Sequence, residues 1–214
     1  MKLYDSILDE KRLAILPKLR FAREQGFYLA GGTALALQIG HRDSIDFDFF
    51  CPTSFDTEEL LSTIQEHFTS GTLVQVQNEK NTLEIIIEGT IRLSFMTYQY
   101  PLIAPLVETE FFDMAALTDI GCMKLSAITS RSAYKDYVDL YFILKSVSLV
   151  ALIDSLKTKL PSLEPMLALK SLVYFDDIVQ EEIIYKTEPI SFGEIKILLL
   201  DAVTRYNTQI LNTK

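Results

Sequence analysis

Residues 28–50 of this chain read YLAGGTALALQIGHRDSIDFDFF, and this stretch decides the fold. A short apolar strand leads into a Gly-Gly-Thr turn, and after a short helix the chain returns through Asp46 and Asp48. Side chains alternate between the two faces of a strand, so the two carboxylates share one face while the apolar residues around them pack on the other. Mg²⁺ is normally held by one or two protein carboxylates together with substrate phosphates. An exposed strand face with two ordinary acids is the alternative, but the flanking apolar residues indicate a buried strand, where unpaired carboxylates would be costly. The stretch therefore predicts a metal site at Asp46 and Asp48.

The glycines Gly31 and Gly32 predict that a phosphate approaches the backbone closely. They lack a Cβ atom, and Thr33 is expected to begin a helix whose unpaired N–H groups attract anions. A plain strand-to-helix turn is the alternative, but the position of the two glycines just before Thr33 favours the phosphate interpretation. Together the two features predict a nucleoside triphosphate (NTP) bound with Mg²⁺. Arg42, on the following loop, is either a further phosphate contact or an ordinary surface residue.

Two blocks of sequence carry a family resemblance. The first block comprises Gly31-Gly32-Thr33-Ala34-Leu35-Ala36-Leu37, His41-Arg42 and Asp46-Phe47-Asp48-Phe49-Phe50, and the second comprises Asp119-Ile120, Met123-Lys124-Leu125 and Lys135-Asp136-Tyr137-Val138-Asp139-Leu140-Tyr141. Both blocks resemble the AbiEii/AbiGii toxin family of the nucleotidyltransferase superfold. The order and separation of the blocks also match, and the resemblance covers about the first two thirds of the chain.

The resemblance implies an α+β fold, with a nucleotidyltransferase-like mixed β-sheet and flanking helices followed by a C-terminal helical bundle. We place the α/β core in residues 1–110 and a helical domain that contributes to the active-site cleft in residues 111–214. The implied activity is Mg²⁺-dependent transfer of a nucleoside monophosphate from NTP to an acceptor hydroxyl, with RNA, particularly a tRNA 3′ end, as the acceptor. A cognate antitoxin is the implied partner. The alternatives are a nucleotide-binding regulatory or interaction module with little or no turnover, and a transferase that modifies a protein hydroxyl or a small molecule such as an aminoglycoside.

The resemblance assigns Lys124 to the triphosphate, where a cation would offset the charge of the leaving pyrophosphate. A surface lysine is the alternative. Asp136 and Asp139 lie about one turn apart on the next expected helix, and one of them either orients the lysine or acts as a general base, with Asp136 preferred. The predicted catalytic residues are Asp46, Asp48, Lys124 and Asp136, and the predicted nucleotide-binding residues are Gly31, Gly32, Thr33, Arg42 and Lys124.

One position departs from the superfold. Many members carry a third carboxylate on a later strand, whereas Ser94 stands where that acid is expected. Three explanations remain open: Glu84 on the neighbouring strand substitutes for the acid, Asp136 deprotonates the acceptor, or the protein binds nucleotide with little turnover.

The composition narrows the class of protein. A chain of 214 residues with 49% hydrophobic content can bury a sizeable core, and its net charge of −9 argues against nonspecific coating of nucleic acid. No apolar run approaches the roughly 18 residues that span a bilayer, and the N-terminus is charged where a signal peptide would be apolar, so no membrane association and a cytoplasmic location are expected. Cys51 and Cys122 are expected to be buried or incidental thiols.

The apolar periodicity predicts the remaining elements. We expect Pro17 to break the first helix, Gly89 to turn a hairpin, and Ser191 with Glu194 to form a capping box. The predicted strands are 28–30, 44–50, 73–76, 82–88 and 90–98, and the predicted helices are 6–25, 33–39, 56–67, 119–129, 134–146, 150–159, 164–175 and 192–211.

Overall fold

The computed structural model describes residues 3–69 and 71–212. Within these ranges the chain forms two compact units. The first contains the described residues up to Pro101 together with Pro105–Ala115, and the second contains Leu102–Ala104 together with the described residues from Ala116 onward. The chain therefore passes between the units at three places.

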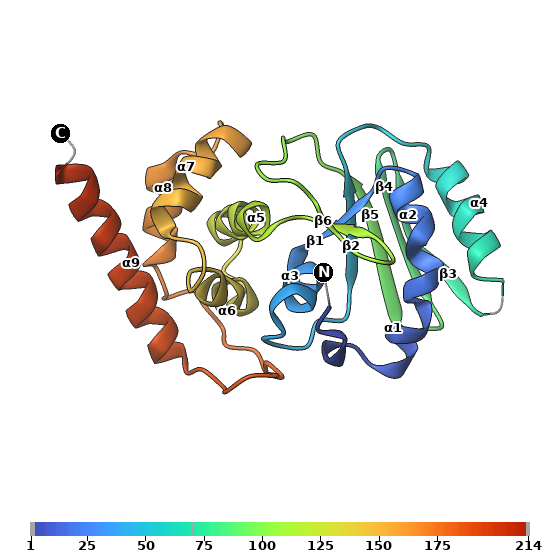
Figure 1. Cartoon of the computed structure of the whole chain (residues 1–214), viewed down its shortest axis with the longest axis horizontal. Helices are drawn as coiled ribbons and strands as arrows, with labels where there is room; N and C mark the ends of the chain where they lie inside the picture. The colour runs from blue at the N-terminus through green and yellow to red at the C-terminus, as the bar shows by residue number, and fades with distance from the viewer. Residues whose placement is uncertain (1–2, 70, 213–214) are drawn as a thin grey trace. The chain divides into compact units, whose positions relative to one another are not determined.

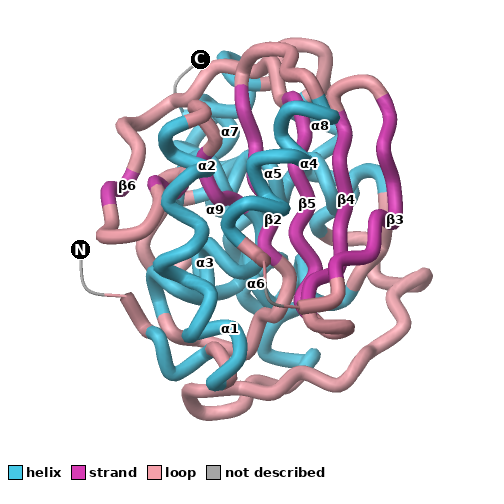
Figure 2. Tube along the Cα trace, turned by 90° about the vertical axis from the view of Figure 1, so that its right-hand side faces the viewer, coloured by secondary structure: helices cyan, strands magenta, loops and turns pink. Residues whose placement is uncertain are grey.

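The first unit is built on a mixed sheet, as the sequence predicts. Its strand order is β3-β4-β5-β2-β1-β7-β6; the β2–β5 and β1–β7 pairs are parallel and the other pairs are antiparallel. Figure 2 shows β2, β5, β4 and β3 side by side. The strands are β1 Tyr28–Ala30, β2 Phe47–Cys51, β3 Leu73–Glu79, β4 Thr82–Ile87, β5 Ile91–Thr97, β6 Val107–Glu108 and β7 Asp113–Met114.

One face of this sheet forms the core. Phe49 and Phe95 point to it from the neighbouring strands β2 and β5, both fully buried, with their rings stacked 5.1 Å apart. Phe21 of helix α2 packs on Phe95 with ring centroids 6.0 Å apart. Figure 1 shows α2 and α4 along this side of the strands. Burying each such ring stabilises the fold by about 1.5–3 kcal/mol, so the alternation of apolar residues fixes which face of β2 is left for Asp48.

The helices of the first unit follow local signals. The predicted helix over residues 6–25 is broken into short segments, and Pro17 lies in a 3₁₀ turn where its missing N–H is tolerated. Asp56 caps α4 by accepting hydrogen bonds from the backbone of Glu58 and Glu59. The segments are η1 Asp5–Ile7, α1 Glu10–Ile15, η2 Leu16–Leu19, α2 Arg20–Glu24, α3 Gly31–Ile39 and α4 Thr57–His67.

Most predicted strands are confirmed. Strand β1 has the predicted bounds, and β4 and β5 form the predicted hairpin around Glu88 and Gly89, both at positive φ. The prediction for residues 44–50 placed the strand start too early, because β2 begins at Phe47. The two-residue strands β6 and β7 were not predicted, and α5 begins at Leu117, two residues before the predicted start at 119.

The second unit is a bundle of helices, drawn from yellow-green to red in Figure 1. Helix α5 contacts α6, α7 and α8, and α9 contacts the same three helices. Gly121 of α5 allows close packing, because a Cβ atom there would lie 2.6 Å from Leu152 Cδ2 of α7. Ser191 and Glu194 form the predicted capping box. The helices are α5 Leu117–Ser130, α6 Tyr134–Ile143, α7 Leu149–Lys159, α8 Pro165–Leu172 and α9 Phe192–Asn212.

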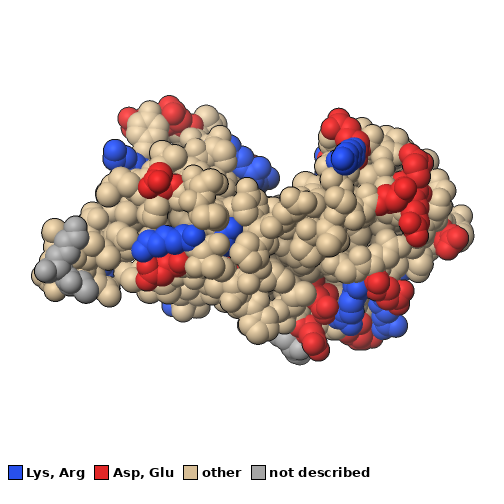
Figure 3. Space-filling view, turned by 90° about the horizontal axis from the view of Figure 1, so that it is seen from above, with Lys and Arg blue, Asp and Glu red and all other residues tan. Residues whose placement is uncertain are grey.

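The surface carries both signs of charge. On the face drawn in Figure 3, basic and acidic side chains lie in small mixed groups between larger uncharged areas. Nonspecific binding to nucleic acid depends on neutralising many phosphates, and this face does not form the continuous basic surface that such binding requires. None of the helices that the structure describes is both long and apolar enough to cross a membrane.

Candidate active site

The turn between β1 and α3 is built on Gly31. Helix α3 begins at this residue, two positions earlier than predicted, and Gly31 has φ +73°, a conformation that favours glycine. Within the described residues, no side chain caps the N-terminus of α3. The first N–H groups of a helix have no partner inside it, so an uncapped N-terminus is suited to bind an anion.

Gly32 is held against Arg42 and Ser44. A Cβ atom on residue 32 would lie 2.7 Å from Arg42 Nη2 and 3.2 Å from Ser44 Oγ, so a larger residue would displace both side chains. Arg42 is only 6% exposed, and its Nη1 donates to the carbonyl of Asp43 at 2.8 Å. Arg42 is therefore not an ordinary surface residue, and its cation lies beside the turn predicted to hold phosphate.

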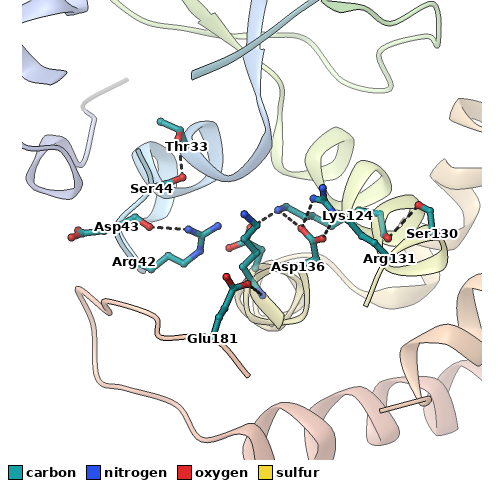
Figure 4. A network of polar contacts seen from close by, with 12 residues as sticks. Thr33, Arg42, Asp43, Ser44, Lys124, Ser130, Arg131, Asp136 and Glu181 are labelled. Atoms are coloured by element: carbon teal, nitrogen blue, oxygen red, sulfur yellow. Dashed lines mark hydrogen bonds and ion pairs between the residues drawn. The ribbon is translucent and has the colours of Figure 1, made fainter. Parts of the chain in front are cut away.

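The side chain of Thr33 connects α3 to the segment that carries the acids. Its Oγ1 donates to the carbonyl of Asp46 and lies 2.8 Å from Ser44 Oγ (Figure 4). Because the hydroxyl is engaged in this way, a phosphate contact by Thr33 would use its backbone N–H. The sequence interpretation did not include Ser44 among the site residues. Its position two residues before Asp46 was the available signal, because side chains two residues apart on an extended segment face the same way.

Asp46 and Asp48 lie beside this turn. Asp48 is on β2, directly opposite Ala30 of β1, and a Cβ atom on residue 31 would lie 2.9 Å from Asp48 Oδ2. Asp46 precedes the strand and is half-buried, as is Asp48. No group of three or more His, Cys, Asp or Glu that could hold a metal occurs in the described part of the chain. Two carboxylates fit Mg²⁺ that takes its remaining ligands from phosphate and water.

Ser94 lies on the strand next to Asp48. It pairs with Asp48 across β2–β5 and with Glu84 across β5–β4, so the three residues form a row on one face of the sheet. Adjacent strands are about 4.8 Å apart, which places Glu84 two strand spacings from Asp48. Glu84 also forms an ion pair with Arg92. This geometry does not support Glu84 as a replacement for the missing acid.

In the second unit, Lys124 is buried between two acids. Its Nζ lies 2.8 Å from Asp136 Oδ1 and 2.5 Å from Asp139 Oδ2, and the residue is 6% exposed. Burial disfavours the charged lysine, but the attraction of Asp139 and Asp136 outweighs it and raises the pKa of Lys124 above its usual value. Lys124 is therefore a fixed cation, and the surface-lysine alternative is wrong.

Asp136 also holds a second cation. Arg131 Nε donates to Asp136 Oδ2 at 2.9 Å, so both oxygens of this fully buried carboxylate accept hydrogen bonds from basic side chains (Figure 4). Of the two roles left open for Asp136, this arrangement fits the one that orients Lys124. A general base would need an oxygen directed at the acceptor hydroxyl.

Comparison with known proteins gives the family. The family model described as "Nucleotidyl transferase AbiEii toxin, Type IV TA system" matches residues 15–189. This chain belongs to the AbiEii family. It is thus a nucleotidyltransferase of a toxin family, as its two sequence blocks predicted. An uncharacterized protein of Aquifex aeolicus (strain VF5) is 37% identical to this AbiEii protein over 169 residues, which are 76% of this chain and 80% of the relative.

Solved structures confirm the nucleotidyltransferase fold. JHP933 from Helicobacter pylori has a TM-score of 0.62 and 19% sequence identity, covering 99% of this AbiEii protein and 98% of its own chain. MenT4, a nucleotidyltransferase toxin from Mycobacterium tuberculosis H37Rv, has a TM-score of 0.59 and 15% identity, covering 89% of this chain and 80% of its own. At these identities the likeness shows the fold, and the roles of individual residues stay predictions.

A second buried ion pair in this AbiEii protein was not predicted. Lys159 Nζ lies 2.7 Å from Asp119 Oδ1, and both residues are fully buried. The Asp119 carboxylate also accepts from the backbone N–H groups of Ile103 and Ala104. Asp119 belongs to the second sequence block, but these contacts give it a structural role inside the second unit.

Both cysteines are buried, as expected. Burial, reinforced by the nearby Asp119 carboxylate, raises the pKa of the Cys122 thiol to about 12. A thiol needs its deprotonated form to act as a nucleophile or metal ligand, so Cys122 is inert near neutral pH.

Proposed function

We propose that this AbiEii protein is a Mg²⁺-dependent toxin that transfers a nucleoside monophosphate from NTP to a hydroxyl of RNA, particularly a tRNA 3′ end. One observation carries the proposal. The carboxylate of Asp48 lies against Gly31 at the uncapped start of α3, so a phosphate bound by the helix N-terminus would lie next to a metal held by the carboxylates.

The residues of the first unit have separate tasks in this proposal. Asp46 and Asp48 hold Mg²⁺, which supplies positive charge to the phosphates and to the leaving group. The backbone N–H groups of Gly32 and Thr33 bind the β- and γ-phosphates, and Arg42 adds a cation beside them. The Thr33 hydroxyl keeps the start of α3 in register with the segment that carries Asp46.

The proposed reaction is an in-line displacement. The oxygen of the acceptor hydroxyl forms a bond to the α-phosphorus, the bond from that phosphorus to the bridging oxygen of the β-phosphate breaks, and pyrophosphate leaves with the bonding electrons. The proton of the hydroxyl passes to solvent water. Such chemistry depends mainly on positioning and on stabilisation of charge, which a fixed turn and fixed carboxylates provide.

Lys124 keeps its assignment as part of the proposal, and of the two roles left open for Asp136 the proposal takes the one that orients the lysine. Lys124 is assigned to the triphosphate by the family resemblance, and Asp136 and Asp139 are positioning residues that fix the lysine and keep it charged. A conservative test compares NTP with the corresponding nucleoside monophosphate in Lys124→Arg. A larger loss of affinity for NTP supports the leaving-group role, whereas equal losses would reduce Lys124 to a structural residue.

The test of the whole proposal is label transfer. The purified protein is incubated with each α-labelled NTP, Mg²⁺ and total cellular RNA, and labelled RNA is resolved by size. Label in the tRNA fraction that is absent without Mg²⁺ and absent in Asp48→Asn supports the proposal. Binding of NTP without transfer to any acceptor would instead favour the nucleotide-binding module, for which Ser94 in place of an acid is the structural argument. A cognate antitoxin that abolishes the transfer, and a cytoplasmic location, complete the proposal.

A further inference from the structure

A row of aromatic residues begins at Phe50, on the same face of β2 as Asp48, and continues into the loop that follows β5. Phe50 lies two residues beyond Asp48 on β2 and therefore points the same way. Its ring contacts Tyr98, with centroids 5.5 Å apart, and Tyr98 contacts Tyr100 at 4.9 Å. Behind them Tyr28 of β1 is buried and packs on Phe50 at 6.2 Å. We call Phe50, Tyr98 and Tyr100 the aromatic row.

The aromatic row is accessible and lies outside the core. Tyr100 is 40% exposed, and Phe50 and Tyr98 are half-buried. The core rings Phe49 and Phe95 occupy the opposite face. Aromatic rings with exposed faces beside a phosphate site can bind a nucleobase, because every base has a π-face and stacking is tolerant of sequence.

The direction of the row decides which base it would bind. In the β1–β2 register Ala30 is opposite Asp48 and Tyr28 is opposite Phe50, so the Gly31-Gly32 turn lies toward the Asp46 end of β2. Phe50 lies at the other end, about 6.6 Å beyond Asp48 at the rise of a strand. In an in-line displacement the attacking and leaving oxygens are on opposite sides of the phosphorus. With pyrophosphate at the turn, the acceptor hydroxyl would approach from the opposite side of the phosphorus, toward which Phe50 lies.

We infer that Phe50, Tyr98 and Tyr100 bind the terminal nucleobase of a single-stranded RNA acceptor by stacking, and so position its hydroxyl at the α-phosphate. This inference rests on the proposed function and names the residues that select a nucleic-acid acceptor. A net charge of −9 argues against binding that depends on neutralising many phosphates, whereas stacking supplies affinity that needs no such neutralisation. An acceptor without a planar ring would lack this stacking contribution.

The test measures binding of a short fluorescein-labelled single-stranded RNA with a free 3′ hydroxyl, by anisotropy in the absence of turnover. The same RNA with an abasic 3′-terminal nucleotide keeps the sugar and phosphates but removes the stacking base. Tyr100→Leu should weaken binding of the intact RNA by about 5- to 150-fold, the range for loss of one stacked base, and leave binding of the abasic RNA unchanged. Tyr98→Leu provides a second variant, and thermal melting confirms that each variant is folded.

Two matched variants complete the design. Tyr100→Phe keeps the ring and should bind intact RNA like the wild type. Phe55→Leu removes a half-buried ring of the same unit that packs on Phe27 and lies outside the row, and it should have no effect on RNA binding. The loss in Tyr100→Leu should also persist between about 50 and 200 mM salt, because an uncharged ring releases no counterions.

The outcomes separate this inference from the proposed function. Equal losses of affinity for intact and abasic RNA in Tyr100→Leu would overturn the inference. A loss of NTP affinity in calorimetry, with RNA binding intact, would also overturn it, because the row would then hold the base of the NTP. If label transfer to RNA proceeds and Tyr100→Leu and Tyr98→Leu both bind RNA normally, the inference alone fails. If the row binds RNA in a base-dependent way and no label is transferred, the proposed function alone fails.

Discussion

Asp48 lies so close to Gly31 that a Cβ atom on residue 31 would be 2.9 Å from Asp48 Oδ2, whereas a Cβ atom on Gly89, at nearly the same φ, would meet nothing within 4 Å. Gly31→Ala and Gly89→Ala should therefore both lose about 1–2 kcal/mol of unfolding free energy through left-handed backbone strain. Only Gly31→Ala also displaces the carboxylate. It should show the larger loss in urea denaturation and should lose Mg²⁺-dependent NTP binding in calorimetry.

The Gly89→Ala variant is the control for this pair. Its alanine carries similar backbone strain, but it lies in the β4–β5 turn, far in sequence from the predicted metal ligands. This variant should therefore bind NTP like the wild type. Equal NTP affinities in the two variants would mean that the contact between Gly31 and Asp48 has no part in binding.

Asp46→Asn and Asp48→Asn test the metal ligands. Each change removes a charge with almost no change in volume, so the melting temperature should stay close to that of the wild type. The affinity for NTP in the presence of Mg²⁺ should fall by at least about tenfold, as measured by calorimetry. Asp154→Asn, at an exposed position on α7, is the matched control and should have no effect. Wild-type affinity in both test variants would remove the metal site.

Lys124→Met tests the buried cation of the second unit. The change leaves Asp136 and Asp139 without their shared partner, and breaking a buried ion pair in this way costs about 3–5 kcal/mol. Chemical denaturation measures the loss. Lys157→Met removes an exposed lysine that pairs with Asp154 and should cost about 0–1 kcal/mol. Similar losses in the two variants would contradict the assignment of Lys124 as a fixed cation.

The raised pKa of Lys124 also sets a pH dependence. A group whose pKa is higher in the folded state stabilises the fold fully below its unfolded pKa, and this contribution is lost as pH rises through the folded value. The ordinary pKa of lysine is 10.5, so the unfolding free energy of the wild type should fall more steeply than that of Lys124→Met above this pH. Parallel profiles in the alkaline range would show that the two acids do not raise the pKa of Lys124.

Ser94→Asp tests the missing third acid. The new carboxylate would be on the strand adjacent to Asp48, about 4.8 Å away at the spacing of neighbouring strands. Without metal, like charges at this distance should lower the melting temperature, and Mg²⁺ should restore it by more than it raises that of the wild type. Ser94→Asn is the uncharged control. A Mg²⁺ response identical to that of Ser94→Asn would show that residue 94 lies outside the metal site.

The elements that could be predicted from the sequence are those with strong local signals. Strand β1 is bounded by Gly26 and Gly31, both at positive φ, and the Ser191 capping box fixes the start of α9. Strands β6 and β7 have two residues each, too few to show an alternating pattern. They form because β7 pairs with β1 and β6 pairs with β7. Strands β1 and β7 are far apart in the sequence, so no local pattern indicates their pairing.

The predicted site residues differ in how far the sequence could place them. The alternation expected for a strand over 44–50 predicted a shared face for Asp46 and Asp48, but β2 begins at Phe47, so strand geometry places only Asp48. The pairing of Ser94 with Asp48 depends on the sheet register, and only the resemblance to the superfold suggested it. The bond from Lys159 to Asp119 joins residues 40 positions apart on two helices, and no sequence pattern indicated it.

The contacts of Asp119 have a consequence for dissecting the protein. The carboxylate holds the backbone of Ile103 and Ala104, which precede β6 and β7 in the chain although those strands belong to the other unit. A fragment cut between residues 115 and 116 would therefore carry away the donors that satisfy Asp119 and leave its buried charge with Lys159 alone. No single cut therefore separates the two units cleanly, because one at this point leaves Leu102–Ala104, a part of the helical unit, on the fragment that carries the sheet.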